Sequence, residues 1–298
     1  MSPTERKALL SRIEARFNAL ADPAYAAFSR ALNPTPRVIL GVRAPAMRKL
    51  AAELMRARES EAFLSAIAEA WASSQHRATP THFGTSVLAA EFTNLGAILI
   101  GRDKHLSLEL RYAFFETWLE QMDGWGTCDT LGSEAHFVRT DAAHWLDWSA
   151  ASLSQVRAAS AASIWRARVA LVILLAHFKA PDYLERVCDQ LSSLALDHAL
   201  RELASHDALA APKPLSSSTG VVFPEALGYY LSMAVAWCWA TLITQSGERA
   251  TKRLLAELDA LALEPTTARR VVRKVRESRA VPLEVKDALR AQVLERLK

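Results

Sequence analysis

Apolar residues recur at helical spacing along almost the whole chain, and this pattern constrains the fold more than any other feature. Leu50 and Leu54 are four residues apart, as are Phe63, Ile67 and Trp71, while charged residues occupy much of the other face. The connections between such segments are short, and none contains a clear strand pattern. With 10 Gly and 12 Pro among 298 residues, the chain has too few turn residues for most all-β folds. The sequence therefore predicts an all-α chain of packed helical hairpins.

The length of the chain and its 51% hydrophobic content allow a large buried core. We expect a single domain over residues 1–298, built as a solenoid of two- or three-helix repeats, although no internal repeat is evident. Residues 211–224 are rich in Pro and Ser and are expected to form an inserted loop. Residues 226–247 carry no charge but contain Gly, Ser and Thr, so they predict a buried helix rather than a membrane span.

The three cysteines, Cys128, Cys188 and Cys238, are widely spaced and form no CxxC pair. This argues against a disulfide framework and a cysteine-rich metal site, and it fits a reducing compartment. The N-terminal segment alternates charged and aliphatic residues and lacks the apolar core of a signal peptide. We therefore expect a cytoplasmic protein, in which Cys188 and Cys238 are buried small residues.

Common cofactor and metal signatures are absent from the chain, which has no GxGxxG, GxxxxGK[ST], GxSxG or HExxH segment. His136, Asp141 and His144 form the one local cluster of candidate ligands. The spacing of the two histidines differs from the i, i+4 pairing of helical metal sites, so surface or capping roles are favoured. We expect neither a metal nor a cofactor.

Basic residues are concentrated at the C-terminal end of the chain, in the region 266–298. Residues 252–298 carry 12 Lys and Arg against 7 Asp and Glu, within a net charge of +4 for the whole chain. Residues 269–279 predict a helix with a valine face turned inward and a basic face turned outward. Such a face can lie along a phosphate backbone, or it can be an ordinary solvated surface. Its candidate DNA contacts are Arg269, Arg270, Arg273, Lys274 and Arg276.

Three tryptophan segments stand out, although core packing explains each of them taken singly. They are Trp125-x-x-x-Asp129, Trp165-x-x-Arg168 and Ala236-Trp237. If the first segment begins a helix, its tryptophan and aspartate share one face, because residues four apart on a helix are neighbours.

Preceded by Gly41-Val42-x-x-Pro45-x-x-Arg48, these segments resemble in order the AlkD-like family of DNA glycosylases. The resemblance implies an all-α fold, namely a right-handed superhelical solenoid of HEAT-like repeats with a concave basic face. It also implies excision of positively charged alkylated purines, such as 3-methyladenine and 7-methylguanine, from duplex DNA. Where this family usually has an acidic residue after the first tryptophan, the chain has Gly126.

The resemblance implies a role for individual residues. Asp129 would be the catalytic carboxylate, and Trp125 and Trp237 would be aromatic walls against the sugar and backbone of the lesion. Arg168 would hold a nearby phosphate. The other arginines of the same segments are candidate DNA contacts, namely Arg166, Arg43 and Arg48.

The implied chemistry suits these residue types. Cleavage of an N-glycosidic bond builds an oxocarbenium-like sugar, which a facing carboxylate stabilises. At about 4 Å and an effective dielectric constant near 20, opposite unit charges attract by roughly 4 kcal/mol. A cationic purine is already a good leaving group, so one carboxylate and a positioned water suffice, without a metal, flavin or nucleotide.

Two other functions remain open at this point. The chain is also compatible with a non-catalytic HEAT-like DNA-binding protein that recognises distorted or branched DNA, since phosphate contacts alone give binding. A protein-interaction scaffold is the third possibility. In the preferred interpretation the partner is duplex DNA, no membrane is involved, and the protein is a monomer that associates with the nucleoid through DNA.

Overall fold

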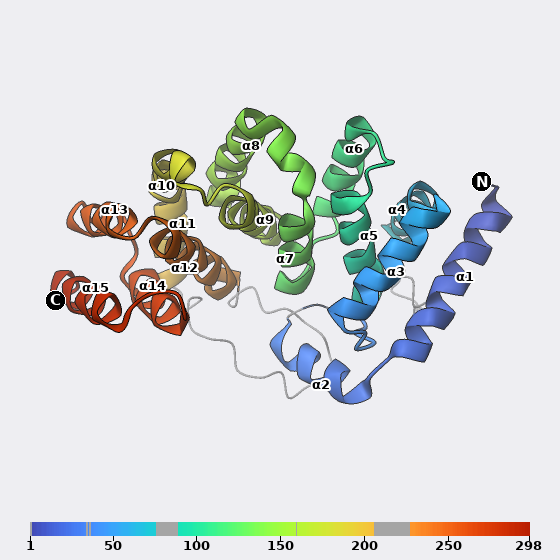
Figure 1. Cartoon of the computed structure of the whole chain (residues 1–298), viewed down its shortest axis with the longest axis horizontal. Coiled ribbons are helices and arrows are strands. Elements are labelled where there is room, and N and C mark those ends of the chain that lie inside the picture. Colours follow the sequence, from blue (N-terminus) through green and yellow to red (C-terminus); the bar gives the residue numbers. More distant parts are fainter. Residues whose placement is uncertain (1, 34, 36, 76–88, 159, 206–226) are drawn as a thin grey trace. The chain divides into compact units, whose positions relative to one another are not determined.

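The computed structural model describes residues 2–33, 35, 37–75, 89–158, 160–205 and 227–298. In these residues it contains fifteen α-helices, three 3₁₀ turns and no strand (Figure 1). The predicted all-α class is confirmed. The predicted loop at 211–224 lies outside the described residues.

The described residues fall into two compact units, one up to Phe137 and one from Val138 onward. Each unit has its own helices and its own core. The single domain and the superhelical path expected from the sequence stay predictions.

The first unit contains seven α-helices. They are α1 (Pro3–Leu20), α2 (Pro23–Leu32), α3 (Ala44–Ala57), α4 (Ser60–Gln75), α5 (Ala90–Arg102), α6 (Leu108–Leu119) and α7 (Trp125–Glu134). Their starts follow from the sequence: Ser2 and Asp22 accept backbone N–H bonds as N-caps of α1 and α2, each followed directly by proline.

Helix α5 forms the centre of the first unit. It packs against α3, α4, α6 and α7, and its residues Leu95 to Ile100 are almost wholly buried. At its N-terminal end, the Phe92 ring meets Phe17 of α1 at a centroid distance of 4.9 Å and Phe63 of α4 at 6.2 Å. The apolar faces of α1, α4 and α5, which are distant in sequence, therefore meet in one core.

Two glycines of α5 allow other chain segments to approach it closely. A Cβ atom at Gly101 would lie 1.9 Å from the carbonyl oxygen of Glu134 at the end of α7. A Cβ atom at Gly96 would lie 2.1 Å from the indole ring of Trp118, whose Nε1–H donates to the Thr93 carbonyl at 2.9 Å. The close approach of α5 to α7 is thus possible because Gly101 has no side chain.

The second unit contains the remaining eight α-helices, preceded by a 3₁₀ turn at His136–Asp141 that begins in the first unit. They are α8 (Ala142–Ser154), α9 (Ala161–His177), α10 (Leu184–Leu191), α11 (Leu194–Ser205), α12 (Leu227–Ser246), α13 (Glu248–Asp259), α14 (Pro265–Glu277) and α15 (Leu283–Arg296).

Helix α12 is the core helix of the second unit and packs most closely against α9 and α14. It is the one helix in the described ranges that is long and apolar enough to cross a membrane. Most of it is nevertheless buried inside the unit, including Leu231, Val235 and Trp239. The sequence prediction of a buried helix in the uncharged segment is confirmed.

Candidate nucleic-acid interface

Helix α7 carries Trp125 and Asp129 on its outer face. The helix begins at Trp125, and Asp129 follows one turn later, so the two side chains share the face that their spacing predicts. Both side chains are half-buried, while Thr127, Cys128 and Leu131 on the opposite face are buried. The pair is therefore accessible at the surface of the first unit.

The start of α7 is held by the end of α2. The Trp125 Nε1–H donates to the Leu32 carbonyl at 2.7 Å, and the Gly126 N–H donates to Asn33 Oδ1 at 3.4 Å. A Cβ atom at residue 126 would lie 2.5 Å from Asn33 Nδ2, and one at Gly124 would lie 2.6 Å from Asn33 Oδ1. Asn33 thus occupies the space that a side chain at residue 126 needs.

The loop before α7 is fixed by the buried guanidinium group of Arg37. Its Nε donates to Asp123 Oδ2 at 2.5 Å, its Nη2 to the Gln121 carbonyl at 2.8 Å and its Nη1 to Thr93 Oγ1 at 2.7 Å. The same group lies over the Trp71 ring, 4.8 Å from the centroid. Because both ends of this loop are bonded to one side chain, the position of Trp125 at its end is well defined.

The Gly-Val-x-x-Pro segment is anchored by a buried carboxylate. Oε1 of Glu91 accepts the N–H groups of Leu40, Gly41 and Val42 at 2.9, 2.8 and 3.3 Å. Gly41 has a φ angle of 86°, and a Cβ atom there would lie 2.2 Å from the Asp22 carbonyl oxygen. Glycine is needed here for both reasons, so this part of the motif shapes the turn into α3.

The two arginines of the same segment form ion pairs within the unit. Arg48 contacts Glu134 at 3.0 Å, and the same carboxylate, only 3% exposed, also pairs with Arg102. Arg43 contacts Asp22 at 3.0 Å and lies over the Tyr25 ring. Both arginine side chains are at least half exposed, and their contacts with DNA stay predictions.

In the second unit, the side chains of the Trp165-x-x-Arg168 segment of α9 contact α12. Arg168 is 5% exposed, and its Nη1 donates to the Tyr230 carbonyl at 2.6 Å. Trp165 packs against the Tyr230 ring at a centroid distance of 5.8 Å. Arg166 is half-buried on α9, donates to Ser152 and lies over the Trp148 ring. The structure thus gives these arginines a packing role, and their phosphate contacts stay predictions.

Trp237 differs from the rest of α12 in its exposure. Its neighbours Ala236 and Cys238 are fully buried, whereas 39% of Trp237 is exposed. A large aromatic side chain at the surface of a core helix is available to a ligand.

Helix α14 has the basic face that the sequence predicts. Val271 and Val275 are buried, while Arg269, Arg273 and Arg276 are exposed. Exposed guanidinium groups on one face suit contacts with phosphates.

Two further basic residues of α14 have contacts within the unit. Arg270 donates to Ser232 at 2.6 Å and lies over the Tyr229 ring, and burial lowers the pKa of its guanidinium group. Lys274 pairs with Glu277 at 2.7 Å.

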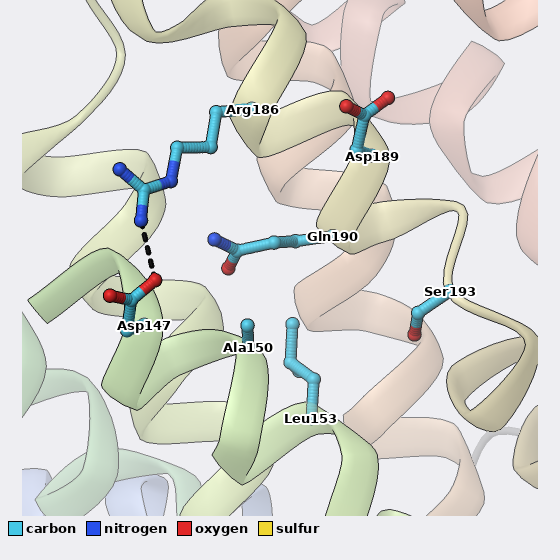
Figure 2. Close-up of a pocket in the computed structure, with 7 residues that line it drawn as sticks. All are labelled: Asp147, Ala150, Leu153, Arg186, Asp189, Gln190 and Ser193. Carbon is cyan, nitrogen blue, oxygen red and sulfur yellow. Dashed lines mark hydrogen bonds and ion pairs between the residues drawn. The ribbon is translucent and has the colours of Figure 1, made fainter. Parts of the chain in front are cut away.

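A pocket of about 270 Å³ lies between α8 and α10 (Figure 2). Figure 2 shows the Arg186 guanidinium directed at Asp147, with a distance of 2.5 Å. The second acid of the pocket, Asp189, pairs with Arg253 at 2.6 Å, and Gln190 donates to the Leu146 carbonyl. Each charged side chain of this pocket has an ion-pair partner, so the pocket is a weak candidate for binding DNA.

Within the part of the chain that the structure describes, no group of three or more His, Cys, Asp or Glu side chains is placed to hold a metal ion. Of the candidate cluster noted in the sequence, Asp141 caps α8 by accepting the N–H of His144 at 3.1 Å. Capping is one of the two roles, surface or capping, that the sequence spacing favours.

Sequence reasoning missed three buried side chains around the candidate site. Arg37 fixes the loop before α7, Glu134 forms ion pairs at the end of α7, and Glu91 anchors the turn into α3. Glu91 and Glu134 are buried acids, and Glu91 stands next to the apolar run of α5. A lone carboxylate at a core position is the signal that would have identified it, because buried charges need partners. Arg37 follows a breaker segment and carries no such signal.

The chain matches the family model described as DNA alkylation repair enzyme over residues 13–208. Comparison with curated proteins and with solved structures gives no significant match. The family match covers more than half of the chain, which therefore belongs to the DNA alkylation repair enzyme family. Membership supports a role in DNA repair with DNA as substrate or partner, and it agrees with the resemblance found in the sequence. The matched residues include Trp125, Asp129 and Arg168 and end before Trp237.

Proposed function

We propose that this protein is a DNA glycosylase that excises positively charged alkylated purines, such as 3-methyladenine and 7-methylguanine, from duplex DNA. The observation that carries the proposal is the pairing of Asp129 with Trp125 on the accessible face of α7, inside the residues that match the repair family. Asp129 is the proposed catalytic carboxylate.

The chemistry follows from charge development at the sugar. As the N-glycosidic bond breaks, positive charge grows on the sugar, and a fixed carboxylate lowers the energy of that state more than the energy of the bound substrate. The cationic base leaves with the bonding electron pair, and water adds to the sugar. A carboxylate gives this benefit only if it stays in place, and the contacts of Arg37 and Asn33 hold the start of the helix that carries Asp129.

The remaining residues have proposed roles in binding. Trp125 and Trp237 contact the sugar and backbone of the lesion, where electron-rich indole faces favour a cation by roughly 0.5–2 kcal/mol. The proposal includes a monomeric solenoid of HEAT-like repeats with a concave basic face, a cytoplasmic location and no metal or cofactor. Its proposed DNA contacts are Arg43, Arg48, Arg166, Arg168, Arg269, Arg270, Arg273, Lys274 and Arg276.

The test is single-turnover release of 3-methyladenine and 7-methylguanine from alkylated duplex DNA, with the wild type and Asp129→Asn. If about 4 kcal/mol of charge stabilisation is lost, the rate falls by roughly a thousandfold. Asp147→Asn is the matched control, because it makes the same chemical change on an exposed residue of α8. Its rate should stay within about twofold of the wild type, since exposed ion pairs contribute little.

A different result would favour the second function. The exposed arginines of α14 suit binding of phosphates without catalysis. If the wild type releases neither base but binds duplex DNA with an affinity that falls steeply with salt, the protein is a DNA-binding member of the family, and the role of Asp129 is wrong.

A further inference from the structure

An open surface pocket of about 510 Å³ lies between helices α14 and α15 in the second unit. This volume lies within the range of small-molecule sites, roughly 300–1,000 Å³. The pocket lies beyond the residues that match the repair family, which end at 208. Its lining residues are Arg269, Val272, Arg273, Arg276, Glu277, Arg290 and Leu294.

The helical spacing of these residues explains why they meet. Arg269, Arg273 and Arg276 are separated by four and three residues, so they form one stripe along α14. Arg290 and Leu294 are four residues apart and form the facing stripe of α15. The pocket is therefore a product of two helices, and Arg290 belongs to it although it lies outside the basic segment at 269–279.

The charges of the pocket are unbalanced. Four arginines face one carboxylate, Glu277, which already pairs with Arg273 at 3.3 Å and with Lys274 at 2.7 Å. The other three arginines, Arg269, Arg276 and Arg290, form no hydrogen bond or ion pair with any described residue and are exposed. Like charges held around one pocket repel each other, so the pocket favours an anion.

We propose that the pocket between α14 and α15 binds a phosphate group, with Arg269, Arg276 and Arg290 as its ligands. A guanidinium group donates two parallel hydrogen bonds to phosphate oxygens, and three such groups match the several oxygens of one phosphate or of two linked phosphates. The side chains of Val272 and Leu294 form an apolar wall beside the arginines, against which the organic part of a phosphate ester can lie. Arg269 and Arg276 are also among the DNA contacts of the proposed function, which this inference extends to a defined pocket with Arg290; phosphate binding there does not depend on the glycosylase activity.

The first experiment is calorimetric titration of the full chain with pyrophosphate in chloride buffer. Arg290→Gln removes one proposed ligand from an exposed position, and Arg279→Gln is the matched control, because it makes the same charge change at an exposed residue that does not line the pocket. We expect Arg290→Gln to weaken binding by about tenfold or more, as loss of a charge-assisted hydrogen bond does. Arg279→Gln should weaken it less than about twofold, because it acts only through the screened field.

Two results would overturn the proposal: no saturable binding by the wild type at millimolar pyrophosphate, or equal weakening by the two substitutions. Thermal unfolding without ligand checks that both variants are folded. Because neither measurement uses damaged DNA, failure of the glycosylase proposal would leave this result unaffected.

The source of the phosphate is identified with undamaged duplex DNA, once pyrophosphate binding is established. If Arg290→Gln also weakens binding of the duplex and pyrophosphate competes with it, the bound phosphate belongs to DNA. If Arg290→Gln binds the duplex as well as the Arg279→Gln control does, the pocket takes a free phosphorylated molecule. Either result is compatible with a phosphate site.

Discussion

Asn33 and Gly126 are in close contact at the start of α7. The amide of Asn33 accepts the Gly126 N–H and lies where a side chain at residue 126 would project. The space beside residue 126 is therefore occupied by the side chain of Asn33, the residue that follows α2.

This arrangement predicts a measurable coupling between the two positions. In a helix, Ala is more favourable than Gly by roughly 0.5–1 kcal/mol, but here the new methyl group would displace Asn33. Gly126→Ala is expected to stabilise the protein by about 1 kcal/mol more when Asn33 is already alanine than when it is present. Urea unfolding of the wild type, the two single variants and the double variant measures this difference. Equal effects of Gly126→Ala in the two backgrounds would contradict the contact.

The residues around α7 also show what the sequence can and cannot predict. The spacing of Trp125 and Asp129 places them on one face, because helical geometry is local. The anchoring of the same helix by Arg37 and Glu134 joins segments more than thirty residues apart, and no local pattern records such a pairing. Buried polar partners are the part of a site that periodicity alone does not reveal.

At the scale of elements, local sequence signals account for the starts of several helices. Proline stands in the first turn of α1, α2, α3 and α14, and the apolar spacing gives each helix its inward face. The close approach of α5 to α7 was not predictable, since a glycine inside a helix indicates close packing without indicating the partner.

The approach of α5 to α7 predicts the effect of Gly101→Ala. A helix interior gains up to about 1 kcal/mol from this change. The new methyl group would meet the backbone carbonyl of Glu134 at 1.9 Å, however, and overpacking costs about 1–3 kcal/mol. We expect a net loss of about 1–2 kcal/mol in the free energy of unfolding, together with slower base release if the proposed function holds.

Urea unfolding and the single-turnover assay measure the two effects of Gly101→Ala. Ser133→Ala is the control, because Ser133 lies on the exposed face of α7 and surface changes stay within about 0.5 kcal/mol. A Gly101→Ala variant as stable as the wild type would show that α7 moves freely relative to α5.

At the scale of the whole molecule, the chain has two cores, and each core contains at least one cysteine. Cys128 is buried in the first unit, and Cys188 and Cys238 are buried in the second. The expectation that Cys188 and Cys238 are buried is confirmed. Burial raises the pKa of the Cys188 thiol to about 12 and that of Cys238 further.

These thiols are predicted to be unreactive in the folded protein. The raised pKa keeps the thiols of Cys188 and Cys238 protonated at pH 8, and the thiolate is the reactive form. Burial keeps the reagent away from Cys128. A colorimetric disulfide reagent should therefore label almost no cysteine in the native chain and three in denaturant. Fast labelling of one cysteine without denaturant would mean that the unit containing it opens readily.

The unequal burial of the tryptophans gives the protein an optical signal of its own. Trp118, Trp145 and Trp239 are fully buried, whereas Trp237 is 39% exposed. A water-soluble quencher such as iodide reaches Trp237 and the half-buried Trp71, Trp125 and Trp148 before the buried indoles. The part of the quenching that Trp237→Phe abolishes therefore comes from Trp237. Loss of that quenching when duplex DNA is added would report, without any label, that DNA covers this side chain.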